Sequence, residues 1–240
     1  MPVSARIVVS PLAGYTARPP WDHFEPSPLG ARLLGLPPGV ERSVEAIAAA
    51  QPEGSGIEYA RAVAETLRTG EPLVLTHAQH RVDDGALRLF TTVTRVRHDA
   101  PGTPVRMDGS FVDVTDHLQY APTTPGDTGI GLVECGSDVV ALVTGEFDAT
   151  EHVALADALR QAVDLGDADG DVFVDARHLR YCDARTIGIL DRTARSLSGR
   201  RRLVVLHPPR ILRRLLAVAA GDGRDLALVV RSTAGVSETG

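Results

Sequence analysis

The segment from residue 139 to residue 190 constrains the fold of this chain more than any other. Residues 139–143 form a short apolar run typical of a buried strand, and the sequence Gly-Glu-Phe-Asp follows at residues 145–148. Apolar residues then recur at helical spacing over residues 155–165, before a second apolar strand at residues 172–174. The sequence Asp-Ala-Arg-Thr-Ile-Gly at residues 183–188 opens another helical pattern. This alternation predicts helices that pack on one sheet.

The same alternation continues towards the end of the chain. A third strand is expected at residues 203–206, where Pro208 and Pro209 end it. A last helix is expected over residues 212–219 and a closing strand over residues 226–230. The second half of the chain is therefore predicted to be an α/β domain.

These motifs resemble a STAS domain of the anti-sigma factor antagonist type, and the resemblance covers residues ~130–231. In that family a strand ends in Gly-Glu-[Ile/Leu/Phe]-Asp, and Asp-Ser-x-Gly opens a later helix, with the serine as the phosphorylation site. Here Asp183 matches the pattern, whereas Ala184 replaces the serine. The resemblance implies a mixed sheet with helices on it and a partner-docking surface that does no chemistry. That surface would comprise Asp148, Asp183, Ala184, Arg185 and Thr186.

The residue types at the start of the helix after Asp183 determine whether a phosphate can be attached there. Asp183 is expected to cap this helix, so a phosphate just after it would lie in the positive field of the helix dipole. Ala184 has no hydroxyl and cannot carry a phosphate, and Arg185 places a cation where the dipole disfavours it by roughly 0.3–1 kcal/mol. Thr186 is either a displaced phosphoacceptor or a local partner of the backbone.

The first half of the chain has a different order of elements. A helical pattern over residues 60–67 ends at Gly70, and two strand-like runs follow at residues 73–82 and 87–96. Asp83, Asp84 and Gly85 join these runs with the residue types of a hairpin turn. A third run at residues 109–116 completes an antiparallel meander, which predicts an α+β domain.

Helices followed by this meander resemble a PAS domain over residues ~20–117, with Gly-x-x-x-Asp-Val-Thr at residues 109–115 as its ending. The resemblance implies a sensor domain that also allows homodimerisation. The first cysteine is Cys135, so the cysteine–flavin bond of light-sensing PAS domains is excluded. The ligand, if any, is unknown, and a purely structural core is the alternative. A haem would need an axial ligand facing the cavity, and the candidates are His77, His80 and His98.

Length and composition indicate two domains and exclude several classes of function. The 240 residues suit two cores, with a Pro-, Gly- and Thr-rich linker at residues 118–129 and a disordered tail at residues 232–240. Eleven Arg oppose fourteen acids in residues 1–120, and fourteen oppose seventeen afterwards, so neither half resembles a general nucleic-acid binder. No segment is apolar enough to span a membrane. Cys135 and Cys182 lack metal-site or disulfide spacing, so we expect no metal and a reducing cytoplasm.

Two further groups of residues have alternative interpretations. Seven arginines lie between residues 195 and 214, and no acid occurs between Arg192 and Gly221. They form either a solvated face or an electropositive patch for an acidic partner or a nucleotide phosphate. No catalytic motif occurs, and His152, His178 and His207 are expected to be isolated surface or edge residues, so we expect no enzyme.

The sequence thus predicts a cytoplasmic PAS–STAS regulator. By resemblance, its partner is an anti-sigma factor or a serine kinase of the histidine-kinase-like ATPase fold. Without the serine at position 184, the protein would bind this partner constitutively, gated only by its PAS half. The alternatives are a stressosome-like scaffold subunit and a small-molecule sensory module with no sigma-factor partner.

Overall fold

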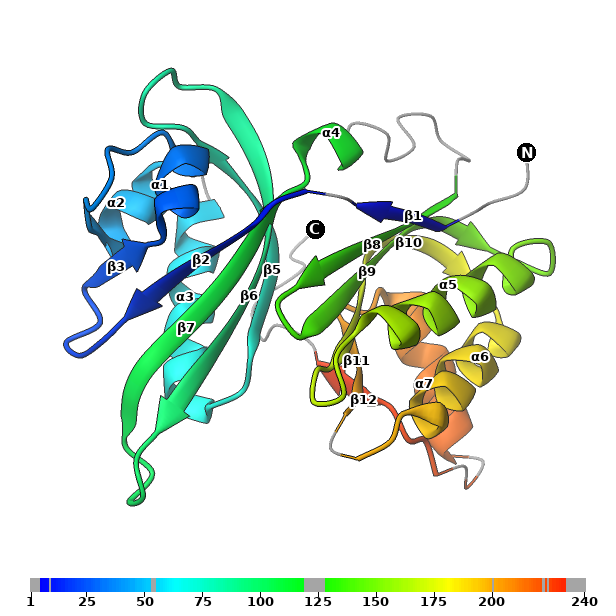
Figure 1. Cartoon of the computed structure of the whole chain (residues 1–240). Helices are drawn as coiled ribbons and strands as arrows, with labels where there is room; N and C mark the ends of the chain where they lie inside the picture. Colours follow the sequence, from blue (N-terminus) through cyan, green and yellow to red (C-terminus); the bar gives the residue numbers. More distant parts are fainter. Residues whose placement is uncertain are drawn as a thin grey trace. The chain divides into compact units, whose positions relative to one another are not determined.

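A computed structural model of the protein describes residues 5–8, 10–52, 55–118, 128–199, 201–221, 223 and 225–231. The chain divides into two units (Figure 1). The N-terminal unit comprises the described part of residues 10–118, and the C-terminal unit comprises the described parts of residues 1–9 and 119–240. Most of the predicted linker at residues 118–129 lies outside the described residues. The predicted tail at residues 232–240 lies wholly outside them.

The N-terminal unit contains an antiparallel sheet with strand order β4-β3-β2-β7-β6-β5. Its strands are β2 (Leu12–Ala17), β3 (His23–Pro26), β4 (Arg42–Ser43), β5 (Leu73–His80), β6 (Leu87–His98) and β7 (Pro104–Asp113). Its helices are α1 (Pro28–Leu34), α2 (Val44–Ala49), α3 (Ser55–Thr69) and α4 (Thr115–Leu118). The predicted PAS-like antiparallel sheet with helices is confirmed.

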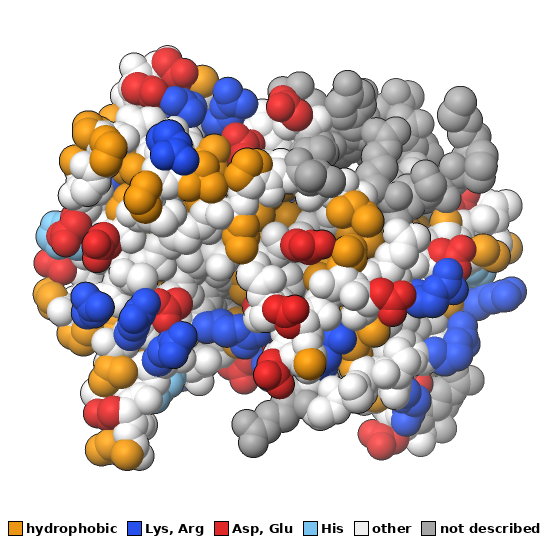
Figure 2. Space-filling view, in the orientation of Figure 1, with side chains coloured by type: hydrophobic (Ala, Val, Ile, Leu, Met, Phe, Trp, Pro, Cys, Tyr) orange, Lys and Arg blue, Asp and Glu red, His pale blue; other side chains and the backbone are white. Residues whose placement is uncertain are grey.

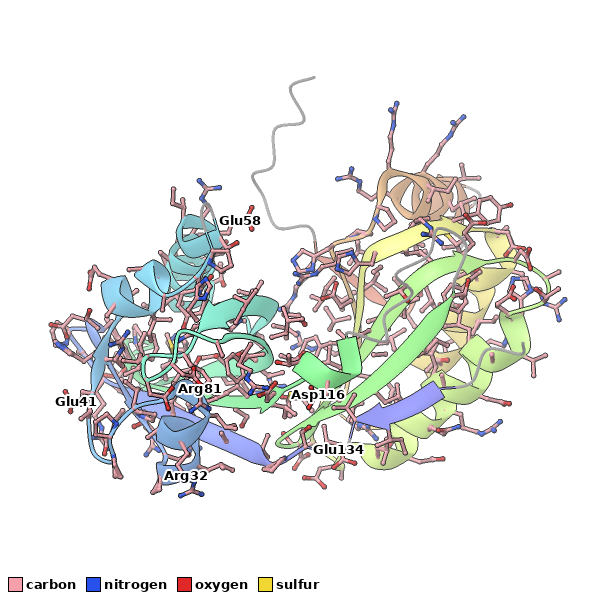
Figure 3. All side chains as sticks on the ribbon, turned by 90° about the horizontal axis from the view of Figure 1, so that it is seen from above. Arg32, Glu41, Glu58, Arg81, Asp116 and Glu134 are labelled. Carbon is pink, nitrogen blue, oxygen red and sulfur yellow. The ribbon has the colours of Figure 1, made fainter. Side chains whose placement is uncertain are left out.

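Local chemistry fixes the ends of these helices. Ser27 caps α1, since its hydroxyl accepts hydrogen bonds from the backbone N–H groups of Gly30 at 3.1 Å and Gly14 at 3.2 Å. Helix α3 ends before Gly70, which has the left-handed φ of 72° that favours glycine. Arg81, in the turn after β5, donates to the carbonyl oxygen of Arg32 at 3.2 Å and so ties this turn to α1 (Figure 3).

Strand β2 shows where the sequence analysis fell short in this unit. It precedes residue 20, the predicted start of the PAS-like domain, yet it pairs with β7 from Leu12↔Val112 to Ala17↔Met107 in the middle of the sheet. Gly14 and Thr16 interrupt its apolar pattern, so only the distant partner strand reveals it. The third strand also begins at Pro104, five residues earlier than the run at 109–116 suggested.

The C-terminal unit contains a six-stranded sheet with order β1-β8-β9-β10-β11-β12. Strands β8 and β9 pair antiparallel and all other neighbours pair parallel, so the sheet is mixed, as predicted. The strands are β1 (Ala5–Val8), β8 (Gly129–Cys135), β9 (Asp138–Phe147), β10 (Val172–Cys182), β11 (Leu203–Leu206) and β12 (Val229–Arg231).

Three helices cover one face of this sheet: α5 (His152–Leu165), α6 (Ala184–Ser196) and α7 (Arg210–Gly221) (Figure 1). Their apolar stripes form one core with the sheet residues that face them, including Ala141, Val174 and Val205. Burial of this face holds α5 and α6 against the ends of β9 and β10.

Three strands of the C-terminal unit differ from the sequence expectations. Strand β1 pairs parallel with β8, beginning at Ala5↔Ile130, and was not predicted at all. Strand β10 extends to Cys182 rather than ending at residue 174, because register shifts let it continue past the polar residues. The closing strand begins at Val229 rather than at residue 226. No helix among the described residues is long and apolar enough to cross a membrane.

Candidate functional site

The predicted docking residues lie where two neighbouring parallel strands end. The parallel pairing of β10 with β9 continues to its last pair, Cys182↔Phe147. Asp148 and Asp183 each follow the last paired residue of their strand. Both therefore lie at the carboxyl ends of the two parallel strands. This register brings the loops that follow the two strands to the same end of the sheet.

Asp183 organises the start of α6. Its Oδ1 accepts hydrogen bonds from the backbone N–H groups of Arg185 and Thr186, both at 3.0 Å, which confirms the predicted N-cap. Burial acts to raise the pKa of Asp183, but hydrogen bonds from Thr186 and His152 outweigh it, and the pKa is lowered. The carboxylate is therefore ionised at neutral pH and complements the helix dipole.

His152 is the functional residue that the sequence analysis placed wrongly. It was expected at the surface, but only 3% of it is exposed, and its Nε2 lies 2.9 Å from Oδ1 of Asp183. His152 is the first residue of α5, so the helix that follows β9 delivers its ring to the cap of α6. Its Nδ1 is buried and has no hydrogen-bond partner among the described residues. The only sequence signal was its position next to the loop after Asp148.

Asp148 is exposed and is held by its own loop. Its Oδ1 accepts from the backbone N–H and from the hydroxyl of Thr150, both at 2.8 Å. The backbone hydrogen bond and then the hydroxyl of Thr150 are the main causes that lower its pKa. No hydrogen bond within the described residues joins Asp148 to Asp183.

The outer surface of this loop is formed by Ala184 and Arg185, which are both exposed. Thr186 lies beneath it with 3% exposure, and its hydroxyl faces Oδ1 of Asp183 at 3.3 Å. The hydroxyl therefore bonds to a side chain rather than to the backbone, and phosphorylation of Thr186 stays a prediction. Tyr181, at 45% exposure beside this edge, was not singled out from the sequence. The exposed part of this loop thus presents a methyl group and a guanidinium group above the ionised cap.

The two other histidines named in the sequence analysis differ from each other. His178 is exposed, as expected. His207 is half-buried, and its Nδ1 lies 3.5 Å from Oδ1 of the buried Asp175, so the expectation of an isolated surface residue is wrong. Arg177 pairs with the same carboxylate at 2.9 Å. Burial acts to raise the pKa of Asp175, but His207 and Arg177 lower it to about 2.

The N-terminal unit encloses a small cavity of about 40 Å³. Five of its twelve lining residues are aromatic, and rings pack edge to face at 5.1 Å between Tyr15 and Phe24 and at 5.5 Å between Phe90 and Phe111. The polar groups in the lining include His77, whereas the other haem-ligand candidates, His80 and His98, are exposed on the strands.

Both cysteines of the chain are buried, and charged side chains of both signs lie on the described surface. Cys135 and Cys182 are buried free thiols, and burial raises the pKa to about 12 and about 11 respectively. Within the described ranges, no three His, Cys, Asp or Glu side chains are grouped to hold a metal ion. On the face seen in Figure 2, acidic and basic side chains are interspersed over much of the surface.

Comparisons with known proteins gave one family match and several similar solved structures. A family model described as "Mlab, STAS domain" matches residues 131–230. A search of curated proteins gave no match. Among solved structures, an anti-sigma factor antagonist from Mycobacterium paratuberculosis is 18% identical, with a TM-score of 0.39, over 45% of this chain and 87% of that one.

Two further solved structures carry sensory domains. The N-terminal domain of a diguanylate cyclase with a PAS/PAC sensor from Marinobacter aquaeolei is 19% identical, with a TM-score of 0.41, over 45% of this chain and 98% of that one. A sensory box histidine kinase/response regulator from Burkholderia thailandensis is 17% identical, with a TM-score of 0.39, over 45% of this chain and 80% of that one. The family match at residues 131–230 and the mixed sheet of the C-terminal unit identify a STAS domain there, and the antiparallel sheet of the N-terminal unit is PAS-like.

Proposed function

We propose that this protein is an anti-sigma factor antagonist-like regulator. Its STAS domain binds an anti-sigma factor or a serine kinase of the histidine-kinase-like ATPase fold. The contact is made at the loop of Asp148, Asp183, Ala184 and Arg185, without serine phosphorylation. The partner class comes from the STAS match at residues 131–230, and the contact comes from the geometry of this loop.

The single observation that carries this proposal is the state of the α6 cap. The helix start is fully formed around Asp183, yet the exposed position next to it is the methyl group of Ala184. The nearest hydroxyl in the first turn, that of Thr186, is buried beneath the surface. The first turn of α6 therefore offers no exposed hydroxyl that could accept a phosphate, which supports docking without phosphorylation at this position.

Control of binding then falls to the PAS-like domain. Its cavity is small and lined largely by buried side chains, so a ligand or a substitution that fills it has to shift the surrounding sheet and helices. Replacement of Thr92, which is 3% exposed and lines this cavity, by Met enlarges the core in the same way. Gating predicts that Thr92→Met changes the affinity for the partner. An unchanged affinity in the folded variant would remove gating from the proposal.

The partner is tested by a pull-down from the source cell followed by mass spectrometry. Wild type is compared with Arg185→Glu, which reverses the exposed charge at the docking loop. The matched control is Arg160→Glu, because Arg160 is an exposed arginine on α5 of the same unit. Recovery of an ATPase-fold kinase or an anti-sigma factor by wild type and the control, with loss in Arg185→Glu, supports the proposal. Recovery of other STAS proteins alone, or equal recovery by all three, contradicts it.

A further inference from the structure

The arginine-rich segment of residues 192–214 divides into two groups in the structure. Arg195, Arg201 and Arg202 have structural partners. Arg195 pairs with Asp191 at 2.9 Å, and Arg202 pairs with Asp171 at 2.9 Å. Arg201 donates to the backbone carbonyl oxygens of Gly170 at 2.8 Å and Val163 at 3.1 Å. Arg201 and Arg202 thus hold the loop between α6 and β11, whereas the pair of Arg195 lies within α6. Arg200 lies outside the described residues.

The second group occupies the first turn of α7. Arg210, Arg213 and Arg214 are all exposed. Their guanidinium groups form no ion pair or hydrogen bond with any residue that the structure describes. The spacing of three and four residues puts them on one side of the helix. No acid occurs from residue 193 to residue 221, so neighbouring chain positions do not neutralise them.

This arrangement opposes the stability of the helix. The first turn of a helix carries positive partial charge, so it favours acids and disfavours cations. Like charges at spacings of three and four residues also repel one another. The three unpaired arginines are therefore a local conflict, and such conflicts are typical of functional surfaces.

We infer that the exposed face of α7 binds an acidic protein surface. Beyond the basic turn, the same helix exposes Ala217 and Val218, the latter at 55%. A partner that offers carboxylates next to a small apolar patch would neutralise the arginines and cover Val218. Helix α7 lies beside α6 on the same face of the sheet (Figure 1). This inference goes beyond the proposed function, since α7 contributes no residue to the docking loop.

The charges favour a protein over a nucleic acid. The free cations are concentrated in one helical turn, whereas nucleic-acid binders commonly make about 6–10 phosphate contacts along a backbone. The whole chain carries a net charge of −6, which repels an extended polyanion. Helix α7 also lacks any aromatic side chain on which a base could stack.

The test uses the purified full chain and a triple variant, Arg210→Gln, Arg213→Gln and Arg214→Gln. The probe is poly-L-glutamate, and duplex DNA and vesicles with anionic lipid are compared with it. We expect wild type to bind poly-L-glutamate, with an affinity that falls as salt rises. The triple variant should bind at least about tenfold more weakly. The matched control is Arg160→Gln, because Arg160 is an exposed arginine on α5. This variant should bind like wild type.

Melting temperature separates this role from a structural one. Because the arginines oppose the helix dipole and repel one another, the triple variant should melt roughly 2–4 °C higher than wild type. Loss of binding together with this rise supports the inference. Unchanged binding or a lower melting temperature overturns it. Tighter binding of DNA or of the vesicles overturns the assignment to a protein partner. Each outcome is independent of the docking-loop pull-down.

Discussion

Replacing Asp183 by Ala should destabilise the C-terminal unit by about 3 kcal/mol. Loss of a helix N-cap costs about 1 kcal/mol. The change also removes the acceptor for His152 Nε2, which is 2.9 Å away, and leaves a buried donor unpaired at a cost of about 1–3 kcal/mol. The two costs arise from separate donors on one carboxylate oxygen, so we expect them to add.

Asp183→Asn separates these contributions. Its side-chain oxygen can still accept hydrogen bonds from the amides of Arg185 and Thr186, so only the added strength of the charge is lost, at about 1 kcal/mol. Asp148→Ala is the control, because Asp148 is exposed and bonds only within its own loop. Its urea midpoint should lie close to that of wild type.

The assay is unfolding in urea, and the unfolding of the C-terminal unit is monitored by hydrogen exchange of peptides from α6 and β10. The single tryptophan, Trp21, lies in the N-terminal unit, so its fluorescence reports on that unit and serves as an internal reference. The expected order of destabilisation is Asp183→Ala, then Asp183→Asn, then Asp148→Ala. If Asp183→Ala cost no more than Asp183→Asn, the bond to His152 would not support the docking loop and this reasoning would be refuted.

Four other predictions follow from the same structure. The pKa of Asp175 is about 2 in the folded state and about 3.9 in an unfolded chain, so its stabilisation is present above pH ~4 and is lost as the pH falls towards 2. Urea midpoints at pH 5, 4 and 3 should therefore fall more steeply for wild type than for Asp175→Asn, and parallel curves would contradict this. Cys135 and Cys182 are buried with raised pKa values, so native protein at pH 7 should not react with maleimide unless urea is added; rapid native labelling would disagree. Gly109→Ala would place a Cβ 2.1 Å from the ring of Tyr15 and should destabilise the N-terminal unit by about 1–3 kcal/mol. Unfolding monitored by Trp21 fluorescence measures this loss. The loss should exceed that of Gly14→Ala, whose added Cβ has its nearest contact at 3.4 Å. Ala184→Asp should weaken binding of the captured partner about tenfold, because the new carboxylate mimics a phosphate. Ala184→Ser is the uncharged control. Equal binding by both variants and wild type would show that the loop is not the contact.

Local sequence patterns were enough to predict the elements with clear periodicity. Apolar periodicity and turn residues predict helices α3, α5, α6 and α7 and strands β5 to β7 and β9 to β12, but they did not predict β1 to β4, β8, α1, α2 or α4. The cap at Asp183 follows from its position before a helical pattern. These features depend on neighbours within a few residues. They are therefore visible without knowledge of the tertiary structure.

What could not be predicted depends on contacts between distant residues. Strands β1 and β2 are short, and each is fixed by a partner strand roughly a hundred residues or more away. His152 has no neighbour in sequence that marks it as buried; the pairing of β9 with β10 brings it to Asp183. The arginine segment illustrates the same point, because only the fold shows that Arg201 is structural and Arg213 is exposed and unpaired.

Site-specific crosslinking tests the central claim most directly. A photoreactive amino acid is placed at the exposed position of Ala184 in the full chain, and a second version carries it at Arg160 as a control. Irradiation in the source cell should join the probe at Ala184, but not the control, to one protein with the histidine-kinase-like ATPase fold. Crosslinks at Ala184 only to other copies of this chain or to other STAS proteins would contradict docking of a kinase or anti-sigma factor at this loop.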